Sequence, residues 1–235
     1  MQDYPIGIRN VAEDGGPQPV TGGIPLVQGE APAGTAFVLV GKDGPVPTQA
    51  TWLAAWPDGS ARWLLLDTVA RAGDYALRAA VSPAPPSPAW ATGTSVGNGL
   101  VRVGPDGTGL RIGDRCGLAL AAIDARGRTY TATFDEIAAE SSGPIRATLA
   151  LSGALRDESG ARLFSCRLRA SVYAGSGRVQ LQPLILVDPA AGVLCNLRSL
   201  SLRIVCAGAT SAAVGGDPGW EGPCATGVRL FQRDD

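Results

Sequence analysis

Two long stretches in the second half of the chain alternate between apolar and polar positions, as half-buried β-strands do. They span residues 145–155 and 162–174, and residues 178–188 continue the pattern as a third strand after a polar turn. Three successive antiparallel strands with a single apolar face need a second sheet to cover that face. We therefore predict a β-sandwich whose buried positions are Ile145, Ala147, Leu149, Leu151 and Leu155 in one strand and Phe164, Cys166, Leu168, Ala170 and Val172 in the next.

The first third of the chain contains shorter apolar runs, separated by some of the 32 glycines and 18 prolines of the sequence. This punctuation is typical of an all-β protein with many turns, and a small barrel suits such short strands better than a sandwich does. A connector with four prolines, "SPAPPSPAW", follows at residues 82–90. We therefore predict an all-β chain of two domains, a small barrel over residues 1–85 and an antiparallel β-sandwich over residues 86–235. Predicted barrel strands lie at residues 20–26, 36–40, 48–56, 61–70 and 74–81, and the only helical candidate, "FDEIAAESSG", is short.

The stretch "WPDGSARW", from Trp56 to Trp63, joins two of the predicted barrel strands. Proline, aspartate and glycine in this order favour a β-turn, so the stretch is interpreted as a hairpin tip. The alternation predicts Trp56 and Trp63 at or near cross-strand positions, with Asp58 able to meet Arg62 across the turn. A ligand site with aromatic walls is the alternative interpretation of the same residues.

Composition excludes several classes of function. The formal net charge of −1 gives no electrostatic basis for binding nucleic acid or an anionic membrane, and no apolar run is long enough for a membrane helix. Histidine is absent, so no catalytic triad and no histidine-ligated metal can be built from this chain alone. The five cysteines have no metal-binding spacing and are interpreted as buried free thiols in a reducing compartment. The start of the chain shows no signal peptide, so we expect a cytoplasmic protein.

Residue types suited to sugar chemistry are present, but they do not form a motif. β-Elimination from a uronic acid needs a cation, a base and an acid. Tyr130, Tyr173, Arg167 and Arg169 are of the right types on the predicted sandwich. Acidic pairs for glycoside hydrolysis are found in "FDEIAAE", where a solubilising role is the commoner one. We therefore expect no catalytic residue and no metal ligand in this chain, and the sequence identifies no cofactor.

One set of residues does resemble a known family. The set is Thr21, Gly22, Gly23, Pro25, Gly29, Gln49, the run from Trp56 to Ser60, Arg62 and Trp63. It is similar to a "TGG-x-P-x-x-x-G … Q … WPDGS-x-RW" pattern in the N-terminal region of the exo-rhamnogalacturonan lyase family, also called YetA-like. The later segment from "ESSGPIRATLALSG" to "YAGSGRVQLQPLILVD" resembles the β-sandwich region of that family.

The resemblance implies a RIFT-like barrel, a central sandwich and then a helical toroid that carries much of the active-site cleft. This sequence stops at "RLFQRDD", which is interpreted as the start of a new strand, so we expect a truncated chain whose partner is the missing C-terminal helical domain. We expect the non-catalytic β portion of a lyase on rhamnogalacturonan-type pectin. The alternative is a free-standing carbohydrate-binding or structural module, in which a tryptophan would stack on sugar. The candidate carbohydrate-binding residues are Trp56, Arg62, Trp63, Arg167, Arg169 and Tyr173.

Overall fold

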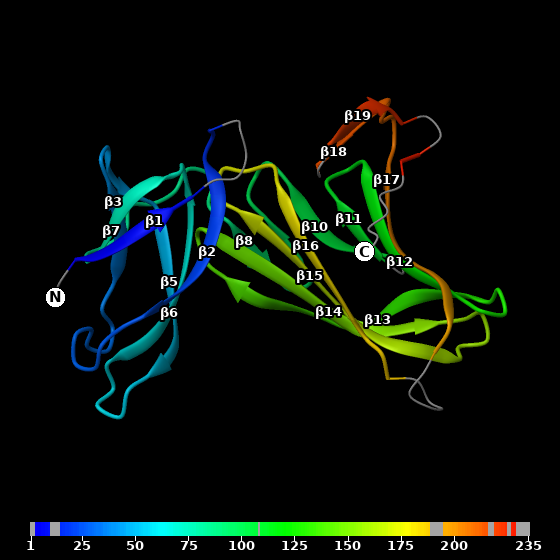
Figure 1. The fold of residues 1–235 in the computed structure, drawn as a ribbon, viewed down its shortest axis with the longest axis horizontal. Coiled ribbons are helices and arrows are strands. Elements are labelled where there is room, and N and C mark those ends of the chain that lie inside the picture. Colours follow the sequence, from blue (N-terminus) through cyan, green and yellow to red (C-terminus); the bar gives the residue numbers. More distant parts are fainter. Residues whose placement is uncertain are drawn as a thin grey trace.

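The structure is a computed structural model that describes residues 3–9, 15–107, 109–188, 195–215, 219–224 and 227–228. Every regular element in these ranges is a β-strand (Figure 1), and they contain no helix that could cross a membrane. The strand predicted at the "RLFQ" segment lies outside the described residues. The strands are β1 (Tyr4–Ile8), β2 (Gln18–Pro25), β3 (Phe37–Gly41), β4 (Gly44–Val46), β5 (Thr48–Ala55), β6 (Ala61–Ala70), β7 (Gly73–Ala79), β8 (Trp90–Thr92), β9 (Ser95–Gly97), β10 (Arg102–Asp106), β11 (Gly109–Ile112), β12 (Cys116–Asp124), β13 (Thr129–Ser142), β14 (Arg146–Arg156), β15 (Arg162–Tyr173), β16 (Val179–Leu186), β17 (Leu197–Cys206), β18 (Ser211–Val214) and β19 (Trp220–Pro223).

The first seven strands form the barrel. They are arranged as two antiparallel sheets, in the order β1-β7-β3-β4 and β2-β6-β5. Both sheets bury alternate apolar side chains in one core, because successive residues of a strand point to opposite faces. In β6, for example, Leu64 and Leu66 lie in this core, whereas Trp63, Leu65 and Asp67 point outward as the alternation predicts. The outward row of the β2-β6-β5 sheet is the surface that meets the rest of the chain.

The later strands form the predicted antiparallel sandwich. Strands β8 to β17 form one continuous hydrogen-bonded sheet, in the order β16-β15-β14-β13-β12-β11-β10-β9-β8 with β17 beside β12. This sheet folds over so that β8 to β12 pack against β13 to β16 as the second layer. The core between the layers joins Val96, Val103, Leu110 and Leu118 to apolar residues of β14 and β15. All ten residues predicted to be buried in these two segments are less than 5% exposed, which confirms the predicted core positions. Thr148, Ala150 and Ala154 on the other face of β14 are buried as well, so β14 is covered on both faces.

Strand β13 connects the two layers. It pairs with β12 over only Thr129 to Thr131 and with β14 over almost all of its length. Its ladder with β14 shifts register twice, between Phe134 and Glu136 and between Ala139 and Ser141. Such bulges bend a strand and increase its twist. The "FDEIAAESSG" segment, the only helical candidate in the sequence, is this irregular half of β13.

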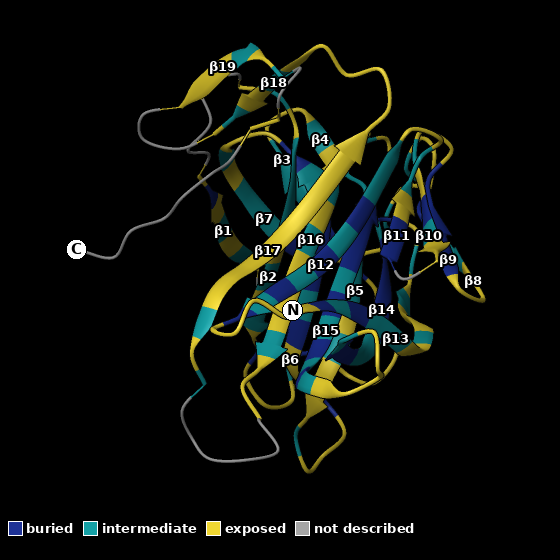
Figure 2. Cartoon of the chain, turned by 90° about the vertical axis from the view of Figure 1, so that its right-hand side faces the viewer, coloured by how far each residue is buried: buried dark blue, intermediate teal, exposed yellow. Residues whose placement is uncertain are grey.

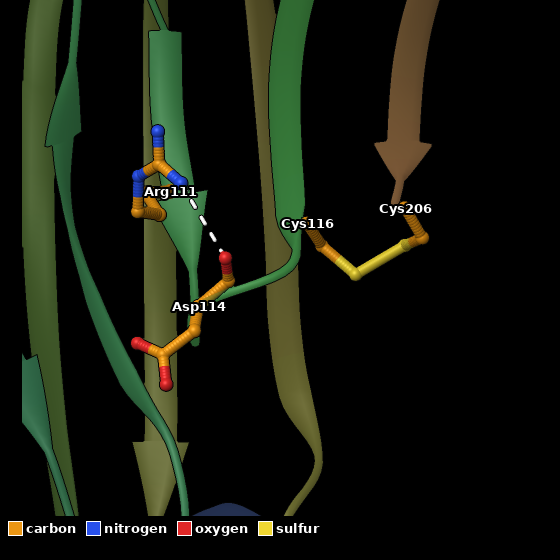
Figure 3. Close-up of a disulfide and its surroundings, with 4 residues drawn as sticks. All are labelled: Arg111, Asp114, Cys116 and Cys206. Atoms are coloured by element: carbon orange, nitrogen blue, oxygen red, sulfur yellow. Dashed lines mark hydrogen bonds between the residues drawn. A yellow bond between two sulfur atoms is a disulfide. The ribbon is translucent and has the colours of Figure 1, made fainter. Parts of the chain in front are cut away.

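Strand β17 lies along β12 and is fastened to it by a disulfide. Cys116 and Cys206 are register partners at one end of the two strands, with their Cα atoms 4.1 Å apart (Figure 3). The prediction of free thiols is therefore wrong for this pair. The two residues are 90 positions apart, so only the register of β17, which sequence spacing does not reveal, brings them together. Cys166, Cys195 and Cys224 are free, and Cys166 is buried as predicted.

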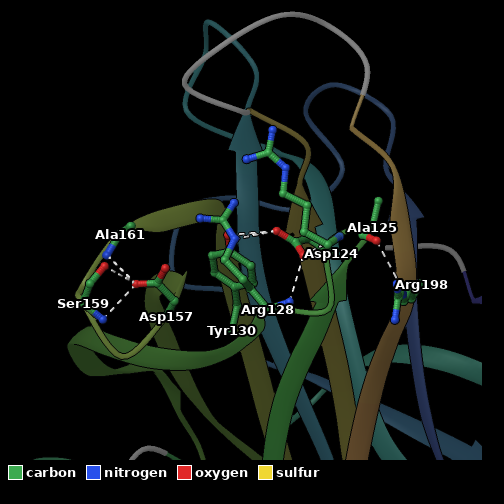
Figure 4. Close-up of polar contacts among 9 residues, drawn as sticks. Asp124, Ala125, Arg128, Tyr130, Asp157, Ser159, Ala161 and Arg198 are labelled. Atoms are coloured by element: carbon green, nitrogen blue, oxygen red, sulfur yellow. Dashed lines mark hydrogen bonds and ion pairs between the residues drawn. The ribbon is translucent and has the colours of Figure 1, made fainter.

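A polar network holds the chain at the other end of β12 (Figure 4). Asp124 accepts hydrogen bonds from the backbone N–H groups of Arg126 and Arg128, and its second oxygen lies 2.8 Å from Arg128 Nε. Burial alone would raise the pKa of Asp124, but the Arg128 bonds outweigh it and hold that pKa below its usual value. In the same turn, the carbonyl of Ala125 accepts a hydrogen bond from Arg198 Nε, so the start of β17 is tied to the ordered turn.

Candidate functional site

The "WPDGSARW" stretch is a tight hairpin between β5 and β6. Trp56 N–H donates to the carbonyl of Ser60, and Gly59 N–H donates to the carbonyl of Trp56. Gly59 has a φ of 80°, a conformation that glycine adopts without a steric penalty. The predicted turn is therefore confirmed.

The side chains of this hairpin are engaged within the barrel. Trp56 Nε1 donates to the carbonyl of Leu26 at 3.0 Å, and the Arg62 guanidinium lies 4.7 Å from the centre of the Trp56 ring. Ser60 donates to Asp58 and accepts a hydrogen bond from Gly29 N–H. These contacts fasten the turn to the segment that follows β2, where Gly29 of the sequence pattern lies.

Two predicted contacts in this hairpin are wrong. Trp63 is the register partner of Ala54, because β5 shifts register on both sides of Ala54, so Trp56 and Trp63 are not cross-strand neighbours. Asp58 hydrogen-bonds Ser60 instead of meeting Arg62, and these Ser60 bonds lower the pKa of Asp58. Simple alternation could not place the Trp63 contact, because the bulge in β5 shifts the pairing of the strands. Asp58 lies in the turn itself, where its carboxylate bonds Ser60 two residues later, as turn aspartates commonly do.

On the outward face of the same sheet, three polar residues form one row across the strands. Asp67 of β6 is the register partner of both Thr21 of β2 and Gln49 of β5. The hydroxyl of Thr21 donates to Asp67 Oδ1 at 2.6 Å. The row therefore presents a carboxylate and an amide side by side, on a face that is otherwise formed by Trp63, Leu65 and Thr51.

The tip of the β13–β14 hairpin docks on this row. Gln49 Oε1 accepts hydrogen bonds from the backbone N–H groups of Ile145, at 3.1 Å, and Arg146, at 3.0 Å. Arg146 Nε lies 3.1 Å from Asp67 Oδ1. A Cβ atom on Gly143 would lie 2.3 Å from Gln49 Oε1, so only glycine leaves room for the amide here. The polar row is thus the contact between the barrel and the sandwich, and we call these five residues with Thr21 the junction site.

The ion pair of the junction site is enclosed. The Asp67 side chain is fully buried, and that of Arg146 is 17% exposed. Burial raises the pKa of Asp67, while the Thr21 hydrogen bond and the Arg146 charge oppose that rise. An aspartate with a raised pKa has the electrostatics of a candidate general base, but here the hairpin covers it. The arrangement is suited to holding two domains in register.

The other sequence-predicted site residues lie on the outward face of β15. Arg167 and Arg169 converge on Glu140 of β13, with Arg169 bound through both Nε and Nη2 at 2.6 and 2.7 Å. The hydrogen bond from Arg169 lowers the pKa of Glu140 against the opposing effect of burial. Tyr173 is buried, and its hydroxyl donates to Gln180 Oε1. The structure thus groups the two arginines together and places them in a different cluster from Trp56, Arg62 and Trp63.

Comparison with known families identifies the first of the two domains. Residues 6–80 match the family model of the PcRGLX-like N-terminal RIFT barrel domain. The chain therefore opens with a RIFT barrel domain of the PcRGLX-like type. No curated protein matches the chain. The matched range includes Thr21, Gln49 and Asp67, so half of the junction site belongs to this RIFT barrel.

Sequence reasoning missed the pairing of Asp67 with Arg146. The alternation placed Asp67 on the outward face of β6. Its position directly after the apolar run "LLL" was the available signal that this carboxylate has a partner. Gln49 of the sequence pattern was a second signal, because nothing about a solvent-exposed strand position requires glutamine in particular. Neither signal identifies the partner, since the hairpin that supplies it is almost 100 residues away.

Proposed function

We propose that this chain is the non-catalytic N-terminal β portion of a polysaccharide lyase that acts on rhamnogalacturonan-type pectin, of the exo-acting, YetA-like kind. The single observation that carries the proposal is the match of residues 6–80 to the PcRGLX-like RIFT barrel. In this proposal the barrel and sandwich form a scaffold, and a helical domain outside the present sequence carries out the elimination.

The geometry of the candidate residues supports a scaffolding role. β-Elimination needs a free cation beside the carboxylate of the sugar, together with a base and an acid. Arg167 and Arg169 both donate hydrogen bonds to the carboxylate of Glu140, and the Tyr173 hydroxyl donates to Gln180. The buried Asp67–Arg146 pair faces a hairpin rather than a cleft. In the part of the chain that the structure describes, no three acidic or cysteine side chains are grouped to hold a metal ion.

A carbohydrate-binding module is a second candidate, and the exposure of Trp63 favours it. Trp63 is 41% exposed on the outward face of the barrel, and its ring lies against Gly23, where no side chain separates it from the strand. Sugars bind to such aromatic faces by stacking, with polar groups nearby to orient the hydroxyls. Trp56, by contrast, is covered by Arg62 and donates its indole N–H to Leu26.

The experiment incubates rhamnogalacturonan I with this chain alone and with the chain extended through the following region of its native gene. The readout is the ultraviolet absorbance of the unsaturated uronate that a lyase releases. We expect the extended protein to be active and the chain alone to be inactive. Turnover by the chain alone, or a native gene without a following helical region, would overturn the proposal.

Binding of rhamnogalacturonan I oligosaccharides by calorimetry tests the second candidate. If the barrel binds sugar through Trp63, Trp63→Ala abolishes the heat of binding. Trp220→Ala is the matched control, because Trp220 is equally exposed, at 42%, but lies in the β18–β19 hairpin. Equal binding by both variants and the unmodified chain would exclude Trp63 as the platform.

A further inference from the structure

Strand β17 carries an apolar row that belongs to the sandwich core but is uncovered. Leu200, Leu202 and Ile204 are register partners of Ala122, Leu120 and Leu118 of β12, so both rows point to the same face of the sheet. The three β12 residues are 1%, 3% and 3% exposed, whereas their neighbours on β17 are 48%, 37% and 54% exposed. Figure 2 shows this change from buried β12 to exposed β17. The core therefore ends one strand before the sheet does.

The backbone of β17 is also open along one side. Within the described residues β17 pairs only with β12, so half of its N–H and C=O groups point to an edge without a described strand. Natural proteins usually protect such an edge with proline, lysine or a short strand. The edge strand β16 contains Pro183, and the edge strand β2 contains Pro19 and Pro25. Strand β17 is 10 residues long and contains neither proline nor lysine.

This edge is held in place rather than frayed. The Cys116–Cys206 disulfide fastens one end of β17, and the hydrogen bonds from Arg198 Nε to Ala125 and from Ala125 N–H to Asn196 fasten the other. Between these points the ladder with β12 is continuous from Cys116 to Ile123. Because β17 is already ordered, pairing an added strand with it costs little free energy for ordering β17 itself.

The free backbone edge and the apolar row together specify the shape of what covers them. A helix would cover the row but would leave the backbone groups unpaired, whereas an extended strand satisfies both. The charge of β17 indicates which residues such a strand would carry. On the opposite face of β17, Arg203 makes no ion pair with any residue the structure describes, and the strand contains two arginines and no acid.

We propose that the open edge of β17 is a docking site for an extended strand of a partner polypeptide, with apolar residues facing Leu200, Leu202 and Ile204 and carboxylates on the Arg203 face. Such a strand extends the sheet by one position and continues the sandwich core over the exposed row. A second copy paired through β17 would bring no carboxylate to the Arg203 face, because β17 contains two arginines and no acid. The proposal goes beyond the lyase scaffold and does not depend on it.

The test uses the complete chain and a fluorescent synthetic peptide of alternating glutamate and valine, 10 residues long to match β17. Fluorescence anisotropy measures binding, and hydrogen exchange with mass spectrometry locates it. We expect saturable binding with slower exchange at residues 197–206. The corresponding lysine–valine peptide should bind about tenfold more weakly, because it places like charges beside Arg203. A glutamate–valine peptide with a central proline, which lacks a backbone donor, should also bind more weakly.

A charge reversal in the protein supplies the matched control. Arg203→Glu should exchange the preference, so that the lysine–valine peptide becomes the tighter ligand. Arg126→Glu, which reverses an exposed arginine in the β12–β13 turn, should leave the preference unchanged. Absence of binding, slower exchange at a strand other than β17, or an unchanged preference in Arg203→Glu would overturn the proposal. Sedimentation as a dimer with β17 protected from exchange would also overturn it, because the occupant would then be a second copy.

Discussion

Replacing Gln49 by alanine removes one side-chain oxygen and leaves two backbone donors without a partner. Ile145 N–H and Arg146 N–H both bind Gln49 Oε1, and the Ile145 residue is 1% exposed. A buried donor that loses its partner costs about 1–3 kcal/mol. Because the partly exposed Arg146 can recover some hydrogen bonding with water, we expect Gln49→Ala to lower the free energy of unfolding by about 2–4 kcal/mol.

Urea unfolding followed by tryptophan fluorescence measures this loss, with Gln182→Ala as the control. Gln182 is an exposed glutamine on β16, and surface changes of this kind stay within about 0.5 kcal/mol. Gly143→Ala should also be destabilising, because its Cβ would meet Gln49 Oε1 at 2.3 Å. The double variant should lose less than the sum of the single losses, since removing the amide makes room for the new methyl group. A Gln49→Ala loss no larger than the control, or additive losses in the double variant, would refute this account of the junction.

Four further outcomes are expected. Burial raises the pKa of Asp67 above 3.8. The stability of the native chain relative to Asp67→Asn is therefore greatest below pH 3.8 and declines as the pH rises through the raised pKa. Unfolding curves over this pH range test the direction of the change. Arg169 lowers the pKa of Glu140 below 4.5. The native chain should therefore be more stable than Glu140→Gln above pH 4.5, by less than about 1 kcal/mol, and this difference should be lost as the pH falls through the lowered pKa. Burial raises the pKa of the Cys166 thiol to about 11, so iodoacetamide at mildly alkaline pH should modify it only after urea is added. Because Cys195 and Cys224 are also free, peptide mapping locates the label, and label on Cys166 in the folded chain would contradict its placement. Cys116→Ser opens a link across 90 residues and should lower the free energy of unfolding by about 3–4 kcal/mol under non-reducing conditions, with no difference from the native chain once dithiothreitol is present.

The alternation of apolar residues was a sufficient guide wherever strands are regular. It predicted the core positions of β14 and β15 because these two strands pair with each other without a shift from Arg146 to Ala154. It failed at Trp63, where the bulge around Ala54 changes the pairing, because an inserted residue leaves no trace in an apolar pattern. It also left the end of β13 ambiguous, since small and acidic residues in that segment suit a turn, a helix or an irregular strand.

The candidate site was less predictable because it depends on contacts between distant segments. The motif residues were found, but their role as a docking surface depends on the β13–β14 hairpin, which the local sequence does not connect to the barrel. The same holds for the Cys116–Cys206 pair, whose partners meet only through the register of β12 and β17. The assignment of Trp56, Arg62, Trp63, Arg167, Arg169 and Tyr173 to carbohydrate binding remains a prediction.

The close approach of Gly143 to Gln49 has a consequence for how relatives of this chain vary. The Gln49 amide occupies the space that a side chain at position 143 would fill. A side chain at position 143 alone therefore clashes with the amide, and loss of Gln49 alone leaves two backbone donors unpaired. Selection is therefore expected to act on the two positions as a pair, although they belong to different domains. Relatives in which position 143 is no longer glycine should also have lost the glutamine at position 49, and a barrel exchanged between such relatives should fit its new sandwich only when both residues are transferred together.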